Sequence, residues 1–190
     1  MKTLLVKTLI FLFAGTIANQ AWAQKLYQVS TEALKLEVHG TSTLHDWEMV
    51  SDIATGTAQF TINNNEFTLS RLLVEMPSAS IKSGTSSMDD NAYKALKTDK
   101  FPKIRLVIKE EQGTLNQEGK IVGTLTIAGV SKDITFTTTV SQVGNDVHTV
   151  GKAAFKLTDF SIDPPTAVFG TIKTGNEVTL YIDALFKEKK

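Results

Sequence analysis

The sequence of 190 residues contains no cysteine. This absence excludes disulfide bonds, thiolate metal sites and a lipid anchor on cysteine. An excess of charge is also absent, because 20 basic residues balance 20 acidic ones. Binding to nucleic acid or to an anionic membrane surface would favour a basic excess. Composition therefore gives no indication of either partner, and the fold must depend on an apolar core alone.

Residues 1–23 have the pattern of a secretory signal peptide. Two lysines precede the apolar run 9–14, and Ala21-Trp22-Ala23 is a small-x-small cleavage motif. The apolar run is too short to span a bilayer, which takes about 20 residues. We therefore expect cleavage after Ala23 and a periplasmic or secreted mature chain, 24–190, without a membrane span. Its formal charge, without those two lysines, is −2.

Eight segments of the mature chain alternate apolar and polar residues with the period of two that is typical of half-buried strands. Turn signals such as Asn63-Asn64-Asn65 and Ala128-Gly129 separate several of them. Short turns favour antiparallel neighbours, so the pattern predicts one all-β domain, a sandwich or a closed barrel. We expect the tail 187–190 to be frayed. The predicted strands cover residues 34–39, 57–62, 71–76, 104–109, 121–127, 134–140, 152–157 and 178–186.

A single helix is predicted at Ser87–Lys97. Ser87 is the expected N-cap, because Asp90 follows three residues later in a variant of the capping box. Phe101-Pro102 is the expected stop. We expect the helix to pack on the sheet as a lid, through a stripe that recurs every four residues. The stripe consists of Met88, Ala92 and Leu96.

Four stretches resemble, in their order, the YceI-like family: residues 86–108, 119–136, 155–165 and 174–186. The most specific features are a helix followed by Phe-Pro and a strand, and the motif Gly-x-Leu-Thr-Ile-x-Gly-Val-x-Lys. The resemblance implies a lipocalin-like barrel of eight antiparallel strands with one short helix between strands. It also implies an apolar pore that holds a polyisoprenoid or another long-chain amphiphile, for carriage or storage.

Apolar residues that face inward, and others at the rim, are the predicted ligand contacts. The inward set is Phe60, Leu72, Val74, Leu106, Leu125, Phe136, Phe155 and Ile182. The rim set is Trp47, Leu96, Phe101 and Phe169. Near the rim, Pro164-Pro165 forces an extended segment, which either closes the core or forms a flexible entrance for a lipid. Alternation alone also leaves open a barrel filled by phenylalanines, which would suit a structural or stress-related protein.

His45 is the one side chain that suggests catalysis. A carboxylate can orient an imidazole as a general base, but adjacent strand residues point to opposite faces. Asp46 therefore cannot serve, and the acid would have to be Asp89 or Asp90. In that alternative the protein is an enzyme, or an enzyme accessory, that acts on a lipid-linked substrate. We prefer the interpretation that His45 stabilises a turn, with no catalytic residue and no cofactor.

The three histidines are scattered through the sequence at His39, His45 and His148. None of them has the His-x₃-His spacing that places two imidazoles on one face. The sequence therefore predicts no metal site, and we expect His39 and His148 to be solvated on the outer face. The oligomeric state is left open, a dimer included.

Overall fold

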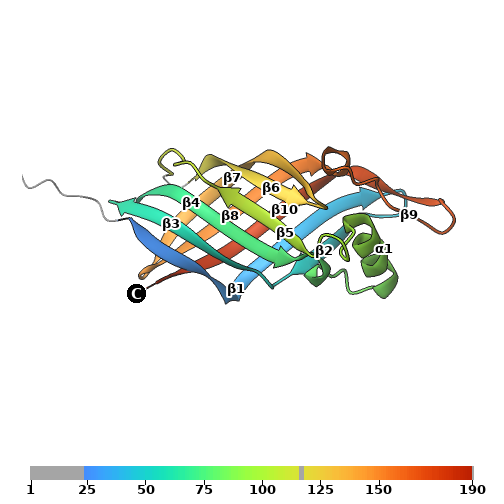
Figure 1. Ribbon diagram of the computed structural model, residues 1–190, viewed down its shortest axis with the longest axis horizontal. Helices are drawn as coiled ribbons and strands as arrows, with labels where there is room; N and C mark the ends of the chain where they lie inside the picture. Colours follow the sequence, from blue (N-terminus) through green and yellow to red (C-terminus); the bar gives the residue numbers. More distant parts are fainter. Residues whose placement is uncertain (1–23, 116–117, 190) are drawn as a thin grey trace, which may run out of the picture.

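The computed structural model describes residues 24–115 and 118–189, and its strands close into an antiparallel barrel (Figure 1). The predicted signal peptide lies outside the described residues. Eight strands form the closed sheet in the order β1-β3-β4-β5-β6-β7-β8-β10, with β10 paired back to β1. The prediction of an eight-stranded barrel is confirmed. The strands are β1 (Lys25–Ser42), β2 (Trp47–Ser51), β3 (Thr55–Asn63), β4 (Glu66–Pro77), β5 (Lys103–Ile108), β6 (Glu118–Ile127), β7 (Val130–Val143), β8 (Asp146–Lys156), β9 (Thr166–Ala167) and β10 (Ile172–Glu188).

Tight turns join β3 to β4 and β6 to β7, as the turn signals predict. Asn64 and Asn65 both have positive φ, 47° and 68°, between β3 and β4. Ala128 and Gly129 also have positive φ, 49° and 80°, between β6 and β7. Two successive residues with positive φ give the turn a twist that matches the flanking strands.

β1 is 18 residues long, three times the predicted segment. Its first part pairs with β3 from Lys25 to Gln28, and its later part pairs with β2 from Leu36 to Gly40. On its other edge it pairs with β10, with a register shift between Val29 and Leu34. A bulge of this kind bends a strand, so one long strand follows the barrel wall and continues beyond it.

β10 also extends further than predicted, to Glu188. The expectation of a frayed C-terminal tail is wrong for the described residues, because Lys189 N–H donates to the carbonyl of Leu26 at 2.9 Å. Glu188 also forms an ion pair with Lys25, with 2.9 Å between Oε1 and Nζ. The last strand is therefore held along its length by β1.

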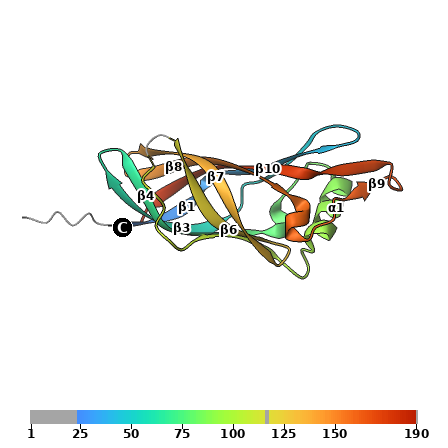
Figure 2. The same cartoon turned by 90° about the horizontal axis from the view of Figure 1, so that it is seen from above.

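Helix α1 (Ser86–Leu96) lies at one end of the barrel, far from the C-terminus (Figure 2). Its N-cap is Thr85, with no side-chain capping bond, so the predicted cap at Ser87 is wrong. The helix ends because Lys97 is left-handed, with φ of 54°, before Phe101-Pro102 is reached. The predicted stripe of Met88, Ala92 and Leu96 does pack against the core. Two 3-10 helices, η1 (Ser78–Ser80) and η2 (Leu157–Phe160), complete the fold.

Aromatic side chains pack against one another inside the barrel towards the end that holds the C-terminus. Tyr27 is fully buried, and its ring meets Phe60 edge to face with 5.6 Å between centroids. Phe60 in turn meets Phe186 at 6.0 Å. Burial raises the pKa of the Tyr27 phenol. Among the described residues, no helix is long and apolar enough to cross a membrane.

Candidate ligand-binding cavity

An inner chamber of about 130 Å³ lies inside the barrel. This is room for on the order of ten water molecules. Its wall is almost entirely hydrocarbon, and the only polar side chains among its described lining residues are Thr138 and Thr149. A buried water needs two to four polar partners, so this chamber suits an apolar occupant much better than water.

All eight residues predicted to face inward line this chamber. Phe60 and Phe136 are each only 1% exposed, and yet open space remains beside them. This open space favours a hollow barrel over one that is filled by its phenylalanines. The eight residues are Phe60, Leu72, Val74, Leu106, Leu125, Phe136, Phe155 and Ile182.

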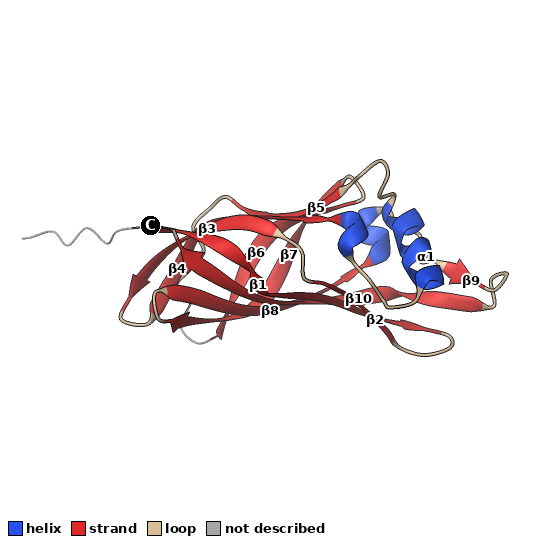
Figure 3. Cartoon of the chain, turned by 90° about the horizontal axis from the view of Figure 1, so that it is seen from below, coloured by secondary structure: helices blue, strands red, loops and turns tan. Residues whose placement is uncertain are grey.

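A second, outer chamber of about 370 Å³ adjoins the first beneath α1. Figure 3 shows the helix across this end of the barrel. Its walls include Leu96 on α1, Trp47 on β2 and the segment 165–167. Five residues line both chambers, so the two are continuous along one apolar wall: Val38, Ile81, Ile104, Ile127 and Phe155.

The outer chamber carries most of the polar groups of the cavity. They are hydroxyls, an amide and one imidazole, and among the described lining residues none is Asp, Glu, Lys or Arg. A long apolar space with a few neutral polar groups at one end can hold a chain whose head group is different from its tail. The polar residues are Ser42, His45, Thr85, Ser87, Asn91, Thr166 and Thr174.

Two of the predicted rim residues lie outside both chambers. Phe101 covers the β6–β7 turn so closely that a β-carbon on Gly129 would lie 2.4 Å from its ring. Phe169 is fully exposed at the turn between β9 and β10, where Val168 and Phe169 have φ of 50° and 53°. The other two predicted rim residues, Trp47 and Leu96, line the outer chamber.

The loop between β1 and β2 holds His45 in a network of local hydrogen bonds. Ser42 Oγ accepts from the backbone N–H of His45 at 3.2 Å and donates to the His45 carbonyl at 2.8 Å. The Nδ1 of His45 donates to the carbonyl of Asp46 at 2.6 Å. This bond of Nδ1 within the loop confirms the interpretation that His45 stabilises a turn.

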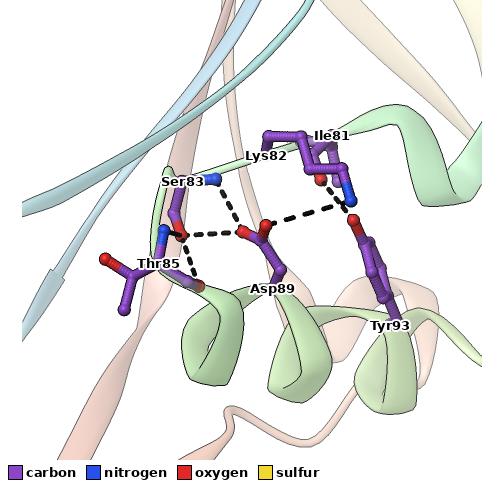
Figure 4. A network of polar contacts seen from close by, with 6 residues as sticks. All are labelled: Ile81, Lys82, Ser83, Thr85, Asp89 and Tyr93. Carbon is purple, nitrogen blue, oxygen red and sulfur yellow. Dashed lines mark hydrogen bonds and ion pairs between the residues drawn. The ribbon is translucent and has the colours of Figure 1, made fainter.

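Asp89 fastens the segment that precedes α1 (Figure 4). Its Oδ1 accepts from the backbone N–H and from the hydroxyl of Ser83, both at 2.7 Å. Lys82 Nζ lies 3.9 Å from Oδ2. The backbone N–H of Ser83 lowers the pKa of Asp89 against the opposing effect of burial, with smaller contributions from the Ser83 hydroxyl and Lys82.

The structure does not bring together the groups that the catalytic alternative requires. His45 lines the outer chamber, but neither Asp89 nor Asp90 is among its lining residues. Asp89 is engaged with Ser83, and Asp90 is exposed on the outer side of the helix.

Sequence reasoning missed several residues of the outer chamber. Met49 is one of them, and its alternation with Glu48 and Val50 is a signal that could have identified β2. Other missed residues come from segments without regular alternation, so no local pattern indicated them. These are Ile81 and Ile162.

Comparison with known proteins agrees with this architecture. A UPF0312 protein from Pseudomonas putida strain W619 is 26% identical over 185 residues, which cover 89% of this chain and 94% of that protein. The fold is similar to that of Burkholderia cenocepacia BcnA, with a TM-score of 0.67, 16% identity, and coverage of 83% of this chain and 98% of that one.

A polyisoprenoid binding domain from Saccharophagus degradans has a similar fold, with a TM-score of 0.63 and 13% identity. The similarity covers 88% of this chain and 100% of that domain. The sequence model of the family described as YceI-like domain matches residues 27–186, most of the chain. The chain therefore belongs to the YceI-like domain family.

Proposed function

We propose that this protein is exported and carries or stores a long-chain amphiphile, with a polyisoprenoid as the first candidate. The observation that supports this most directly is the inner chamber, whose lining is hydrocarbon apart from two threonines. Transfer of each CH₂ group from water to such a site contributes about 0.8 kcal/mol. A long chain can therefore bind without any specific polar contact.

The outer chamber suits the polar end of such a ligand. Its hydroxyl and amide groups come from the end of β1, from α1 and the residue before it, from β9 and from the start of β10. Because no carboxylate, ammonium or guanidinium group is among the described lining residues, we propose an uncharged head group, such as an alcohol. A charged head group would lie here without an ion pair, which is costly in a desolvated site.

Two further observations are consistent with this proposal. The structural neighbour from Saccharophagus degradans is described as a polyisoprenoid binding domain. The beginning of the chain has the composition of a signal peptide that ends at Ala23. We propose on that basis a mature N-terminus at Gln24 and a location in the periplasm or outside the cell.

The test is native mass spectrometry of protein recovered from its own compartment, followed by extraction with organic solvent. We expect a mass that exceeds the chain by one bound molecule, a chain that starts at Gln24, and an extract that contains an isoprenoid or a similar long-chain alcohol. A chain that starts at Met1 would contradict the export proposal. Protein that carries no lipid, and that takes up none from isoprenoid micelles, would contradict the carrier proposal.

A further inference from the structure

Three potential metal ligands meet on the outer face of the barrel, away from the cavity. Glu37 and His39 are two residues apart on β1, so their side chains share one face. Glu48 on β2 is the direct pairing partner of His39. One nitrogen of the imidazole and one oxygen of each carboxylate all lie within 4.8 Å of one another.

The Nε2 atom of His39 has no hydrogen-bond partner and is shielded from solvent. The ring as a whole is partly exposed, with 41% of the side chain accessible. Tyr181 stacks obliquely on it, with 4.8 Å between the ring centroids. Leaving a shielded imidazole nitrogen unpaired costs free energy, so a group that bonds to Nε2 at this position would be stabilising.

The distances around Nε2 leave room for an ion rather than a direct hydrogen bond. Glu37 Oε2 lies 3.8 Å away and Glu48 Oε2 lies 3.7 Å away. Ligand atoms bound to zinc at about 2.1 Å are separated by about 3.4 Å at a tetrahedral angle and by more at wider angles. We propose that Glu37, His39 and Glu48 bind one divalent transition-metal ion, with Zn²⁺ as the first candidate.

The ligand set selects the class of metal. An imidazole suits zinc and the other late first-row ions, whereas Mg²⁺ and Ca²⁺ prefer oxygen ligands alone. Lys35 is ion-paired with Oε1 of Glu37, which leaves Oε2 directed at His39. The positive charge of Lys35 also opposes a cation, and Glu48 is 60% exposed. We therefore expect moderate affinity, with water completing the coordination.

A metal at this position would fasten β2 to β1 beside the outer chamber. β2 pairs with β1 along one edge. Its other edge makes only an isolated bridge, from Val50 to Lys82, in the described part of the chain. The same short strand carries Trp47 and Met49 into the chamber wall. Metal binding would therefore stabilise the wall of the cavity from outside.

The test is a titration of tag-free, metal-depleted protein with Zn²⁺ in competition with a chromophoric chelator. His39→Asn and Glu48→Gln each remove one ligand. His148→Asn is the matched control, because His148 is a second imidazole on the outer face that pairs with a single carboxylate, Asp183, at 2.7 Å. We expect binding of one ion, weakened at least about tenfold in both ligand variants and unchanged in the control.

Absence of saturable binding would overturn the proposal. Binding that survives in His39→Asn, or that is lost equally in His148→Asn, would overturn it too. Glu48→Gln changes an exposed side chain and keeps its size, so loss of zinc binding in that variant with an unchanged apo melting temperature supports a ligand role. None of these outcomes depends on the lipid, so the result is separate from the proposed function.

Discussion

Gly40 on β1 lies directly beneath the indole ring of Trp47, its pairing partner on β2. A β-carbon on Gly40 would lie only 2.2 Å from Cζ2 of the ring. The indole N–H donates to the carbonyl of Thr41 at 2.9 Å, which fixes the orientation of the ring. Because Gly40 has no side chain, Trp47 can lie against β1, and Trp47 also lines the outer chamber.

Gly40→Ala should displace the indole and lower the free energy of unfolding by about 1–3 kcal/mol, the usual cost of overpacking. Urea denaturation measures this effect. Gly113→Ala is the control, because a β-carbon there meets no atom within 4 Å, and it should change stability by less than about 0.5 kcal/mol. Equal effects of the two substitutions would show that Trp47 does not require the glycine.

Asp89→Ala should lower the free energy of unfolding by about 1–3 kcal/mol at neutral pH. The reason is that the backbone N–H and hydroxyl of Ser83 lose their charged partner. Asp90→Ala removes an exposed carboxylate from the next residue and should have little effect. Similar losses in the two variants would contradict the role given to the Ser83–Asp89 contact.

The same contact predicts a dependence on pH. The pKa of Asp89 is lowered in the fold from its ordinary value of 3.8. The carboxylate therefore stabilises the fold fully above that ordinary value, and this contribution disappears as the pH falls through the lower pKa of the folded state. The stability difference between the parent and Asp89→Ala should accordingly shrink below pH 3.8. A difference that is constant down to the acid transition would contradict this.

Leu96→Asp tests the packing of α1 over the cavity. Leu96 is half-buried and lines the outer chamber, so an aspartate there should lower the free energy of unfolding by about 2 kcal/mol. Lys94→Asp places the same residue on the exposed side of the same turn and controls for the effect of charge on the helix. A difference below about 0.5 kcal/mol between the two variants would mean that the stripe faces solvent.

His45→Ala should leave ligand binding within a few-fold of the parent, because the histidine bonds within its own turn. A general base typically contributes 10²–10⁴-fold to a rate. The measurement is a comparison of binding, and of hydrolysis of a lipid-linked substrate, by the two proteins. Activity that collapses by such a factor in the variant would make the enzyme alternative the better one.

The inward side of the barrel could be predicted because strand alternation is a local property. Phe60, Leu106 and Phe136 needed only their own neighbours in sequence to be placed inside. The cap of α1 could not be predicted in this way, since a contact between the helix and the segment before it overrides the capping motif. Asp89 bonds back to Ser83 outside the helix, while Ser87, with a suitable sequence for a cap, lies inside it.

Trp47 and Leu96 were predicted to lie at the rim, but most of the outer chamber could not be predicted, because its walls come from distant parts of the chain. Ile81 follows η1, Ile162 follows η2, and Met49 lies on a short strand. The cluster of Glu37, His39 and Glu48 could not be predicted either. Glu48 comes close to the other two residues only through the pairing of β2 with β1. Spacing along one strand or helix cannot reveal ligands that a sheet register brings together.

The most direct test of the proposed carrier function is to fill the inner chamber from its wall. Gly151 lines the chamber, and a β-carbon there would lie 3.3 Å from the nearest atom, the hydroxyl of Thr138. This contact is tight, so a larger side chain projects into the open space once the hydroxyl of Thr138 shifts by a few tenths of an ångström. Val122→Leu is the matched control, because it enlarges an outward-facing side chain that is 47% exposed.

Binding of a fluorescent polyene to Gly151→Leu, measured beside a thermal melt, is the decisive measurement. We expect the parent and Val122→Leu to bind one molecule each, and Gly151→Leu to bind at least about tenfold more weakly. The melting temperature of Gly151→Leu should be nearly unchanged, because the leucine fills an existing cavity and does not strain a packed core. A parent that binds no polyene, or a Gly151→Leu variant that binds as well as the parent, would contradict the assignment of the barrel interior as the ligand site.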